Sequence, residues 1–244
     1  MVVVHGGGPQ ADALAERLGH KVRKVQGRRI TDDDALEVAK MVYGGSINVE
    51  LLAALKRHGA RGVGVSGVDA GLVNVTRRPP RLVRDPATGA EEWVDFGHVG
   101  DIESVDVALL ELLLREGYVP VVASLAADAE GRLYNVNADT VAASLGVGLR
   151  AERLYLLTNV PGILHDPADP STLVTECDLE KLEDMVASGV IRGGMLPKAQ
   201  NCIEALEAGV AVVQILDGAG DRSHLIESLT RDGIGTRITG SKQV

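Results

Sequence analysis

The sequence predicts an α/β fold, a three-layer αβα sandwich with a mostly parallel central sheet and added β-hairpins. Apolar, β-branched runs that end at glycine or proline turns alternate with stretches in which apolar residues recur every three or four positions. The apolar runs are nearly continuous, as in strands buried on both faces. At 244 residues and 45% hydrophobic content, the chain can bury a large core as one large or two small domains.

Charge and composition exclude several classes of function. A net charge of -9 argues against sequence-independent nucleic-acid binding, which depends on clustered Lys and Arg. No uninterrupted apolar stretch reaches about 18 residues, so we expect no membrane span. Cys177 and Cys202 match no metal spacing or disulfide framework, and the six histidines are scattered. We therefore expect no metal held by protein side chains, and a reducing, cytoplasmic location.

The chain opens with a strand, a glycine turn and a helix. An apolar run at residues 2–4 precedes three glycines at 6–8, and Pro9 leads into a helix with Ala11, Leu14, Ala15 and Leu18 on one face. Such a junction lets backbone N–H groups approach an anion closely. It matches neither a Walker A loop nor a dinucleotide-binding loop. The alternative is a tight turn without a ligand.

Residues 21–67 predict a hairpin, two helices and a strand. Two short basic strands flank Gly27, and a capped helix begins near Thr31 or Asp32, which puts Arg28 and Arg29 beside a helix N-terminus. Helices are expected at 34–43 and 47–58, separated by two glycines at 44–45, and a buried strand at 61–67.

Residues 70–99 form a region of β-hairpins with turn signals at 78–80 and 85–89. This region carries the only Trp and the only Phe, Trp93 and Phe96, which we expect to pack the hairpin down.

Helices and strands alternate in the rest of the chain. The expected helices span residues 105–116, 139–148, 178–188, 196–208 and 223–231. The expected strands span residues 118–124, 153–158, 210–216 and 236–239, with a hairpin over 126–137.

Two further segments gather polar groups where strands meet turns or helices, which is where ligands collect in open α/β sheets. In YNVNAD, Asn135, Asn137 and Asp139 occupy alternate positions and can share one face, or Asp139 can simply cap the next helix. In RGGMLPK, Lys198 follows two glycines near a helix start, where the helix dipole disfavours a cation unless an anion lies between them.

These segments, in this order, resemble the amino-acid kinase family, and within it the branch that phosphorylates N-acetyl-L-glutamate. The matching stretches cover nearly the whole chain: VVVHGGGPQ, GRRITD, GHVGDI, GYVPVVAS, EGRLYNVNADTVAASL, LYLLTNVPGIL, GGMLPK and GIGTRI. The resemblance implies an ATP-dependent phosphorylation of the γ-carboxylate in arginine biosynthesis.

The resemblance also implies roles for individual residues. Gly7 and Gly8 would supply backbone N–H groups to the reacting carboxylate and the phosphoryl group, and Arg29 would pair with the substrate α-carboxylate. Asn135 would bind substrate, Asp139 would orient the catalytic lysines, and Lys198 would neutralise the γ-phosphoryl. The nucleotide-binding residues implied are Thr158, Asn159, Gly162, Gly194 and Lys198. Mg²⁺ would be held through the ATP phosphates.

The same resemblance predicts one kinase domain over residues 1–244. Residues 1–150 would form the substrate-binding and dimerisation lobe, and residues 151–244 the nucleotide-binding lobe. We expect a homodimer.

Two departures leave alternatives open. The family normally carries a K-x-G-G strand and turn before the segment that opens this chain, so either the start is set downstream or one catalytic lysine is lost. Asn48-Val49 stands where relatives usually have Asn-Lys. The alternatives are a kinase acting on a carrier-linked aminoadipate in lysine biosynthesis, or a catalytically silent paralogue.

Overall fold

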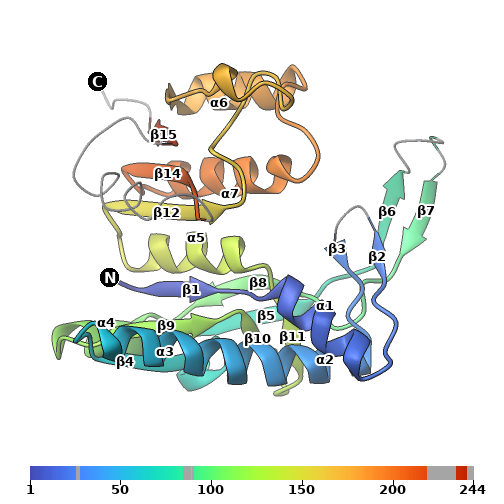
Figure 1. The fold of residues 1–244 in the computed structure, drawn as a ribbon, viewed down its shortest axis with the longest axis vertical. Coiled ribbons are helices and arrows are strands. Elements are labelled where there is room, and N and C mark those ends of the chain that lie inside the picture. The colour runs from blue at the N-terminus through green and yellow to red at the C-terminus, as the bar shows by residue number, and fades with distance from the viewer. Residues whose placement is uncertain (26–27, 85–88, 90, 219–234, 241–244) are drawn as a thin grey trace. The chain divides into compact units, whose positions relative to one another are not determined.

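The computed structural model describes residues 1–25, 28–84, 89, 91–218 and 235–240 (Figure 1). It separates into two compact units, Met1–Val141 and Ala142–Val244, with the boundary inside helix α5 (Ala138–Gly148). The expected helix at 223–231 lies outside the described residues.

A parallel sheet at the start of unit 1 carries the opening strand. Its order is β1 (Val3–His5), β9 (Val119–Ala123) and β4 (Gly62–Ser66), with His5 opposite Ala123. The glycine turn thus leaves the sheet at its carboxyl edge, where ligands bind in α/β folds. Helix α4 (Ala108–Arg115) precedes β9 in the chain.

Three helical segments that follow α1 (Gly8–Arg17) form one continuous helix over 33–57, and the expected break at the two glycines is wrong. They are α2 (Asp33–Ala39), the π-helical η1 (Lys40–Ile47) and α3 (Asn48–Arg57). The glycines lie inside η1. Glycine costs about 1 kcal/mol in a helix, but Val42 and Tyr43 of η1 are buried in a core with α1, α2 and β9. This tertiary packing outweighs the local preference for a break.

A second sheet in unit 1 is mixed. Its order is β11 (Leu133–Asn135), β10 (Leu125–Ala127), β5 (Val73–Arg77) and β8 (Gly100–Val105). The expected hairpin over 126–137 is present as β10 and β11. The expected helix at 105–116 begins only at Ala108, because β8 continues to Val105.

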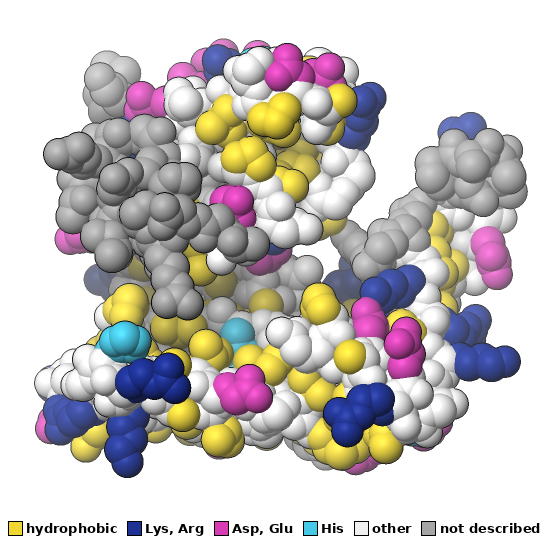
Figure 2. Space-filling model, viewed as in Figure 1, with side chains coloured by type: hydrophobic (Ala, Val, Ile, Leu, Met, Phe, Trp, Pro, Cys, Tyr) yellow, Lys and Arg dark blue, Asp and Glu magenta, His cyan; other side chains and the backbone are white. Residues whose placement is uncertain are grey.

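Two hairpins extend this unit: β2 (Lys24–Val25) with β3 (Arg28–Arg29), and β6 (Arg81–Arg84) with β7 (Glu91–Val94). Phe96 is buried as expected, but Trp93 is 68% exposed, so that expectation is wrong. Side chains alternate along a strand, and since Val94 turns inward, Trp93 turns outward. Figure 2 shows hydrophobic side chains at the surface of the β6–β7 hairpin.

Unit 2 contains a four-stranded mixed sheet with helices packed on it. Its order is β12 (Arg153–Thr158), β14 (Val212–Asp217), β15 (Thr236–Thr239) and β13 (Glu176–Asp178), and β12 runs parallel to β14. Helix α7 (Met195–Glu207) packs on β14, and α6 (Leu179–Ala187) packs on α7 (Figure 1). A core of Leu, Ile, Val and both buried cysteines fills the space between them. The predicted α/β fold with parallel sheets is confirmed.

Within the described part of the chain, one helix, 33–57, is long and apolar enough to cross a membrane by length and composition alone. Core helices of soluble proteins pass the same test. Val38, Ala39 and Val42 of this helix are buried against α1.

Candidate active site

In the glycine turn between β1 and α1, the N–H groups of Gly7 and Gly8 have no hydrogen-bond partner among the described residues. Each of its carbonyl oxygens accepts a bond: Gly6 from His5 Nδ1 at 2.9 Å, Gly7 from the Ala11 N–H at 2.9 Å, and Gly8 from Arg29 Nη2 at 2.9 Å. None of the hydrogen bonds among described residues uses the N–H of Gly7 or Gly8 as its donor. With no acidic side chain in the first turn of α1, this end suits an anion.

Close packing against the π-helical segment requires a glycine at position 7. A Cβ on Gly7 would overlap Ile47 Cδ1 and lie 3.0 Å from the Tyr43 ring, whereas a Cβ on Gly8 would meet nothing within 4 Å. Burial raises the pKa of Tyr43, with Arg29 acting against that shift, so the Tyr43 hydroxyl stays neutral beside the turn. Gly7 is therefore closed on one side by protein, and Gly8 is open on the side where a Cβ would project.

Arg29 connects the β2–β3 hairpin to α1. Its guanidinium is largely buried, with 9% of the side chain exposed, and Nη2 binds both the Gly8 carbonyl and the Asp12 carboxylate. The Nε and Nη1 hydrogens make no bond to any described residue, and these donors suit a carboxylate. The structure thus brings Arg29 to the glycine turn, as the predicted site requires.

Asn135 lies near Arg29 because its side chain bonds to Thr31, which is fully buried. Its Nδ2 lies 3.3 Å from Thr31 Oγ1, and its N–H donates to the His98 carbonyl at 2.9 Å. Because Thr31 follows Arg29 by two residues, Asn135 and the arginine are held on neighbouring backbone segments.

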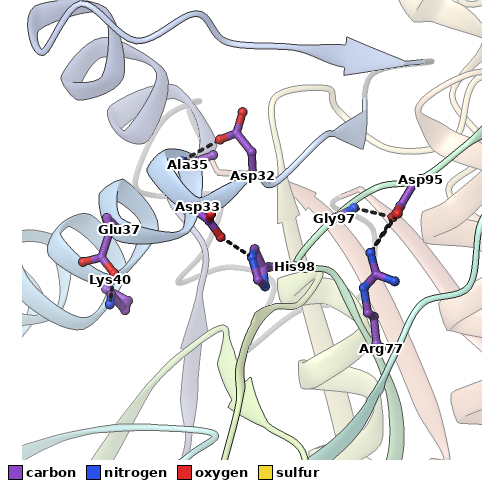
Figure 3. A network of polar contacts seen from close by, with 9 residues as sticks. All are labelled: Asp32, Asp33, Ala35, Glu37, Lys40, Arg77, Asp95, Gly97 and His98. Carbon is purple, nitrogen blue, oxygen red and sulfur yellow. Dashed lines mark hydrogen bonds and ion pairs between the residues drawn. The ribbon is translucent and has the colours of Figure 1, made fainter.

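A network of ion pairs and hydrogen bonds holds residues 95–98, whose His98 carbonyl accepts from the Asn135 N–H (Figure 3). His98 points at Asp33 in the first turn of α2, with 2.7 Å between Nε2 and Oδ1. Asp95 accepts from the Gly97 N–H at 2.9 Å and from Arg77 at 2.8 Å, and these bonds lower the pKa of its carboxyl. No local pattern indicates this network, since its members lie up to 65 positions apart.

The extended segment that was expected to place Asn135, Asn137 and Asp139 on one face ends at Asn135. Asn137 caps α5 by accepting from the Thr140 N–H at 3.1 Å, and Asp139 already lies in the first turn of that helix. Asn137, not Asp139, is thus the cap. The strand ends at Asn135 because the backbone then enters the helix.

In unit 2, Thr158 ends β12 directly beside Asp217, its partner at the end of β14. Asn159 is exposed just beyond this carboxyl edge. Gly162 is buried, and a Cβ there would lie 2.6 Å from Thr236 Oγ1 and 2.9 Å from Leu173 Cδ1. The glycine is therefore required for packing against β15.

Gly194 and Lys198 lie at the start of α7. Gly194 precedes the helix without a side-chain cap, and no acidic residue occupies the first turn. A Cβ on Gly194 would meet nothing within 4 Å, and Lys198 is half-buried one turn into the helix. The local geometry matches the sequence-based expectation of a glycine approach followed by a lysine.

Two other features bear on ligands. A cavity of about 380 Å³ is lined by Arg29, His20, Asp34 and neighbouring residues but not by Gly7, Gly8 or Asn135, so we do not assign it to the substrate. Among the described residues, no group of three or more His, Cys, Asp or Glu side chains is arranged to hold a metal ion.

A family model described as the amino acid kinase family matches residues 1–217. The chain belongs to the amino acid kinase family. This confirms the family expected from the sequence motifs. Acetylglutamate kinase of Methanothermobacter thermautotrophicus is 43% identical over 238 residues, which are 98% of this chain and 81% of that protein. Acetylglutamate kinase of Myxococcus xanthus is 46% identical over 237 residues, 97% of this chain and 77% of that protein.

Solved structures of other proteins have a similar fold. N-acetylglutamate synthase from Neisseria gonorrhoeae, complexed with coenzyme A and N-acetyl-glutamate, matches with a TM-score of 0.79 and 29% identity over 98% of this chain and 52% of that chain. Giardia carbamate kinase matches with a TM-score of 0.66 and 17% identity over 98% of this chain and 84% of that one, which supports the fold alone.

Proposed function

We propose that this chain transfers the γ-phosphoryl group of ATP to the γ-carboxylate of N-acetyl-L-glutamate, a step of arginine biosynthesis. The observation that carries the proposal is the glycine turn: its carbonyl oxygens all accept hydrogen bonds, while the N–H groups of Gly7 and Gly8 donate to no residue that the structure describes. Relatives that cover nearly the whole chain at 43% and 46% identity are acetylglutamate kinases. They lend no support to the carrier-linked alternative.

The chemistry needs charge compensation rather than a general base. A γ-carboxylate has a pKa of about 4.3 and is already ionised at neutral pH. Two anions must be brought together in line, and phosphoryl-transfer catalysis is mostly positioning and electrostatic stabilisation. In the proposed site, the Gly7 and Gly8 N–H groups meet the reacting oxygens, Arg29 pairs with the α-carboxylate, and Asn135 binds the substrate.

The nucleotide is assigned to unit 2. We propose that Thr158, Asn159, Gly162 and Gly194 border the nucleotide, and that Lys198 reaches its γ-phosphoryl group. The uncapped start of α7 fits a phosphate, since backbone N–H groups and a lysine are both donors there. Mg²⁺ bound to the phosphates would supply further positive charge.

The decisive experiment traps the product. With ATP, Mg²⁺ and N-acetyl-L-glutamate, an acyl phosphate forms that hydroxylamine converts to a hydroxamate, and unacetylated glutamate is the control substrate. We expect hydroxamate formation that depends on the acetyl group. Calorimetric binding of ATP and N-acetyl-L-glutamate without any hydroxamate would instead identify a silent paralogue and contradict the proposed reaction.

We also propose a homodimer in the cytoplasm, with one kinase domain whose residues 1–150 bind substrate and dimerise and whose residues 151–244 bind nucleotide. Two buried cysteines, Cys177 and Cys202, that match no disulfide framework in the sequence fit a reducing compartment. Light scattering of the purified chain tests the dimer, for which we expect twice the 25.6 kDa chain mass.

A further inference from the structure

The His5 side chain, the last residue before the glycine turn, is bound through both of its ring nitrogens. Nδ1 lies 2.9 Å from the Gly6 carbonyl oxygen, and Nε2 lies 3.2 Å from Nδ2 of Asn48. Asn48 begins α3, directly after the π-helical segment, and only 5% of its surface is exposed. The two residues are 43 positions apart, so only the fold joins them.

The partners of Asn48 determine which nitrogen of His5 carries the proton. Nδ2 of Asn48 lies 3.1 Å from the Val121 carbonyl oxygen, which can only accept, so the nitrogen of the amide faces Val121 and His5. Nε2 of His5 must therefore accept, and the proton resides on Nδ1, which donates to the Gly6 carbonyl. Burial lowers the pKa of His5 and keeps the ring neutral, which this arrangement requires.

Close packing leaves the Asn48 amide little room. A Cβ on Gly64 of β4 would overlap Asn48 Oδ1, so the absence of a side chain there makes space for the amide. If the amide turned over, its oxygen would face the Val121 carbonyl and both bonds from Nδ2 would be lost. The packing around Asn48 thus fixes the tautomer of His5.

The bond to Gly6 has a direct consequence for the site. In a planar trans peptide the C=O and N–H point in opposite directions, so fixing the Gly6 carbonyl also fixes the Gly7 N–H. Glycines flank this peptide on both sides and allow it many orientations. The His5 ring is the only side chain among the described residues that bonds to this carbonyl.

We propose that His5, held in its Nδ1–H tautomer by Asn48, is a positioning residue that aims the Gly7 N–H at the anionic group bound in the glycine turn. The proposal rests on the proposed function insofar as that anion is the reacting carboxylate or phosphoryl group. His5 itself does not touch the substrate and exchanges no proton with it.

Two substitutions distinguish the hydrogen bond made by Nδ1 from the one made by Nε2. In His5→Asn, the side-chain NH₂ takes the place of Nδ1 and can still donate to Gly6. In His5→Gln, the amide takes the place of Nε2 and can meet Asn48 but not Gly6. We expect kcat with N-acetyl-L-glutamate to fall ~10- to 100-fold in H5Q, by comparison with the loss of one oxyanion donor. H5N should recover most of kcat, with KM for ATP unchanged in both.

Matched controls separate positioning from stability. His58→Gln makes the same replacement at an exposed histidine and should leave kcat unchanged. Thermal unfolding of H5N and H5Q shows whether either variant is misfolded. Equal losses of kcat in two folded variants would overturn the proposal, as would full activity in H5Q.

A second measurement does not depend on catalysis. Nitrogen NMR of the histidine ring in the unsubstituted chain should show the proton on Nδ1, and Asn48→Ala should shift the population toward Nε2–H. Addition of N-acetyl-L-glutamate should move the Gly7 amide resonance more in the unsubstituted chain than in H5Q. A proton on Nε2 in the unsubstituted chain would refute the proposal even if the kinase is active. The proposed tautomer in an inactive chain would instead count only against the kinase function.

Discussion

Helices α6 and α7 follow one another in unit 2 but begin in opposite ways. The Asp178 carboxylate caps α6 by accepting from the Lys181 N–H at 2.9 Å, and Glu180 adds negative charge to its first turn. Helix α7 begins at Met195 after the N-cap residue Gly194, with no side-chain cap and no acidic residue in the first turn. Among the described residues, the first N-terminus therefore carries a side-chain cap, and the second does not.

Unit 1 repeats the contrast. Asp32 caps α2 by accepting from the Ala35 N–H at 2.9 Å, and Asp33 and Asp34 lie in its first turn. Helix α1 follows the N-cap residue Gly7 and has neither a side-chain cap nor an acidic residue in its first turn. Among the α-helices that the structure describes, the two without an acidic residue in the first turn, α1 and α7, are those whose ends the family resemblance assigns to ligands. Capping and charge therefore distinguish structural helix ends from candidate ligand-binding ends in this chain.

The largest expected effect comes from the lysine of α7. Lys198→Ala should lower kcat by ~10²–10³, by analogy with removal of one group that stabilises transition-state charge, and leave KM for N-acetyl-L-glutamate nearly unchanged. Lys181→Ala is the matched control, because Lys181 is exposed in the first turn of the capped helix α6. Steady-state kinetics should show no change in this control, and similar losses in both variants would refute the comparison.

Arg29 is expected to act on binding. Arg29→Ala should raise KM for N-acetyl-L-glutamate ~10- to 100-fold, because a hydrogen bond to a charged group contributes ~1.5–3 kcal/mol, with a smaller change in kcat. Arg29→Lys keeps the charge but loses the planar fork, so it should recover only part of the affinity. Arg17→Ala, at an exposed position in the last turn of α1, controls for loss of positive charge. Normal KM in Arg29→Ala would contradict the site assignment.

The two glycines of the turn should respond differently to alanine. Gly8→Ala adds a methyl group where no protein atom lies within 4 Å, so stability should stay constant or rise by up to ~1 kcal/mol while activity falls at least ~10-fold. Gly7→Ala overlaps Ile47 and should destabilise the fold. Chemical denaturation beside kinetics measures both. A fully active Gly8→Ala variant would place the phosphoryl group elsewhere.

At the capped N-terminus of α6, substitution should change stability and leave activity unchanged. Asp178→Ala removes the cap of α6 and should lower the free energy of unfolding by ~1 kcal/mol, with kcat and KM unchanged. Asp178→Asn retains an acceptor and should recover most of that loss. A change in KM for ATP without a change in stability would mean that this end of α6 also binds ligand.

The smallest effect concerns His5, whose pKa is lowered by burial. The unfolded chain binds a proton near the ordinary pKa of about 6.5, and the folded chain binds it only at lower pH. Stability from His5 is therefore present above that pH and declines as pH falls from 6.5 toward the folded value. Denaturation at pH 7 and pH 5 should show a smaller drop in H5N than in the unsubstituted chain, and equal drops would contradict the lowered pKa.

Many helices and strands could be predicted from local sequence patterns. The strand–turn–helix at the start, the β2–β3 hairpin, the β10–β11 hairpin, and α5, α6 and α7 all lie within a few residues of the positions their patterns predicted. Glycine turns, caps and apolar periodicity are local signals, and each of these elements carries its own. The roles assigned to the site residues came from the family resemblance and remain predictions.

The remaining features depend on contacts between distant segments. No local pattern indicates that a helix runs through Gly44 and Gly45, that Trp93 faces outward, or that Asn48 meets His5. Asn48, an amide next to apolar helix residues in the sequence, is at most a weak indication of a buried hydrogen bond and does not name His5 as its partner. These outcomes depend on what packs against each residue, and that is settled only when the whole core forms.

By itself, then, the amino-acid sequence determined the order of strands and helices, the strand–glycine turn–helix that opens the chain and the family of the chain, because these depend on residues close together along the backbone. Only the tertiary structure decided which carbonyls of that turn are bound, which N–H groups stay open and which tautomer His5 adopts. The reason is that hydrogen-bond partners 21 to 73 positions apart, such as Arg29 with Gly8 and Asn48 with Val121, meet only in the folded chain.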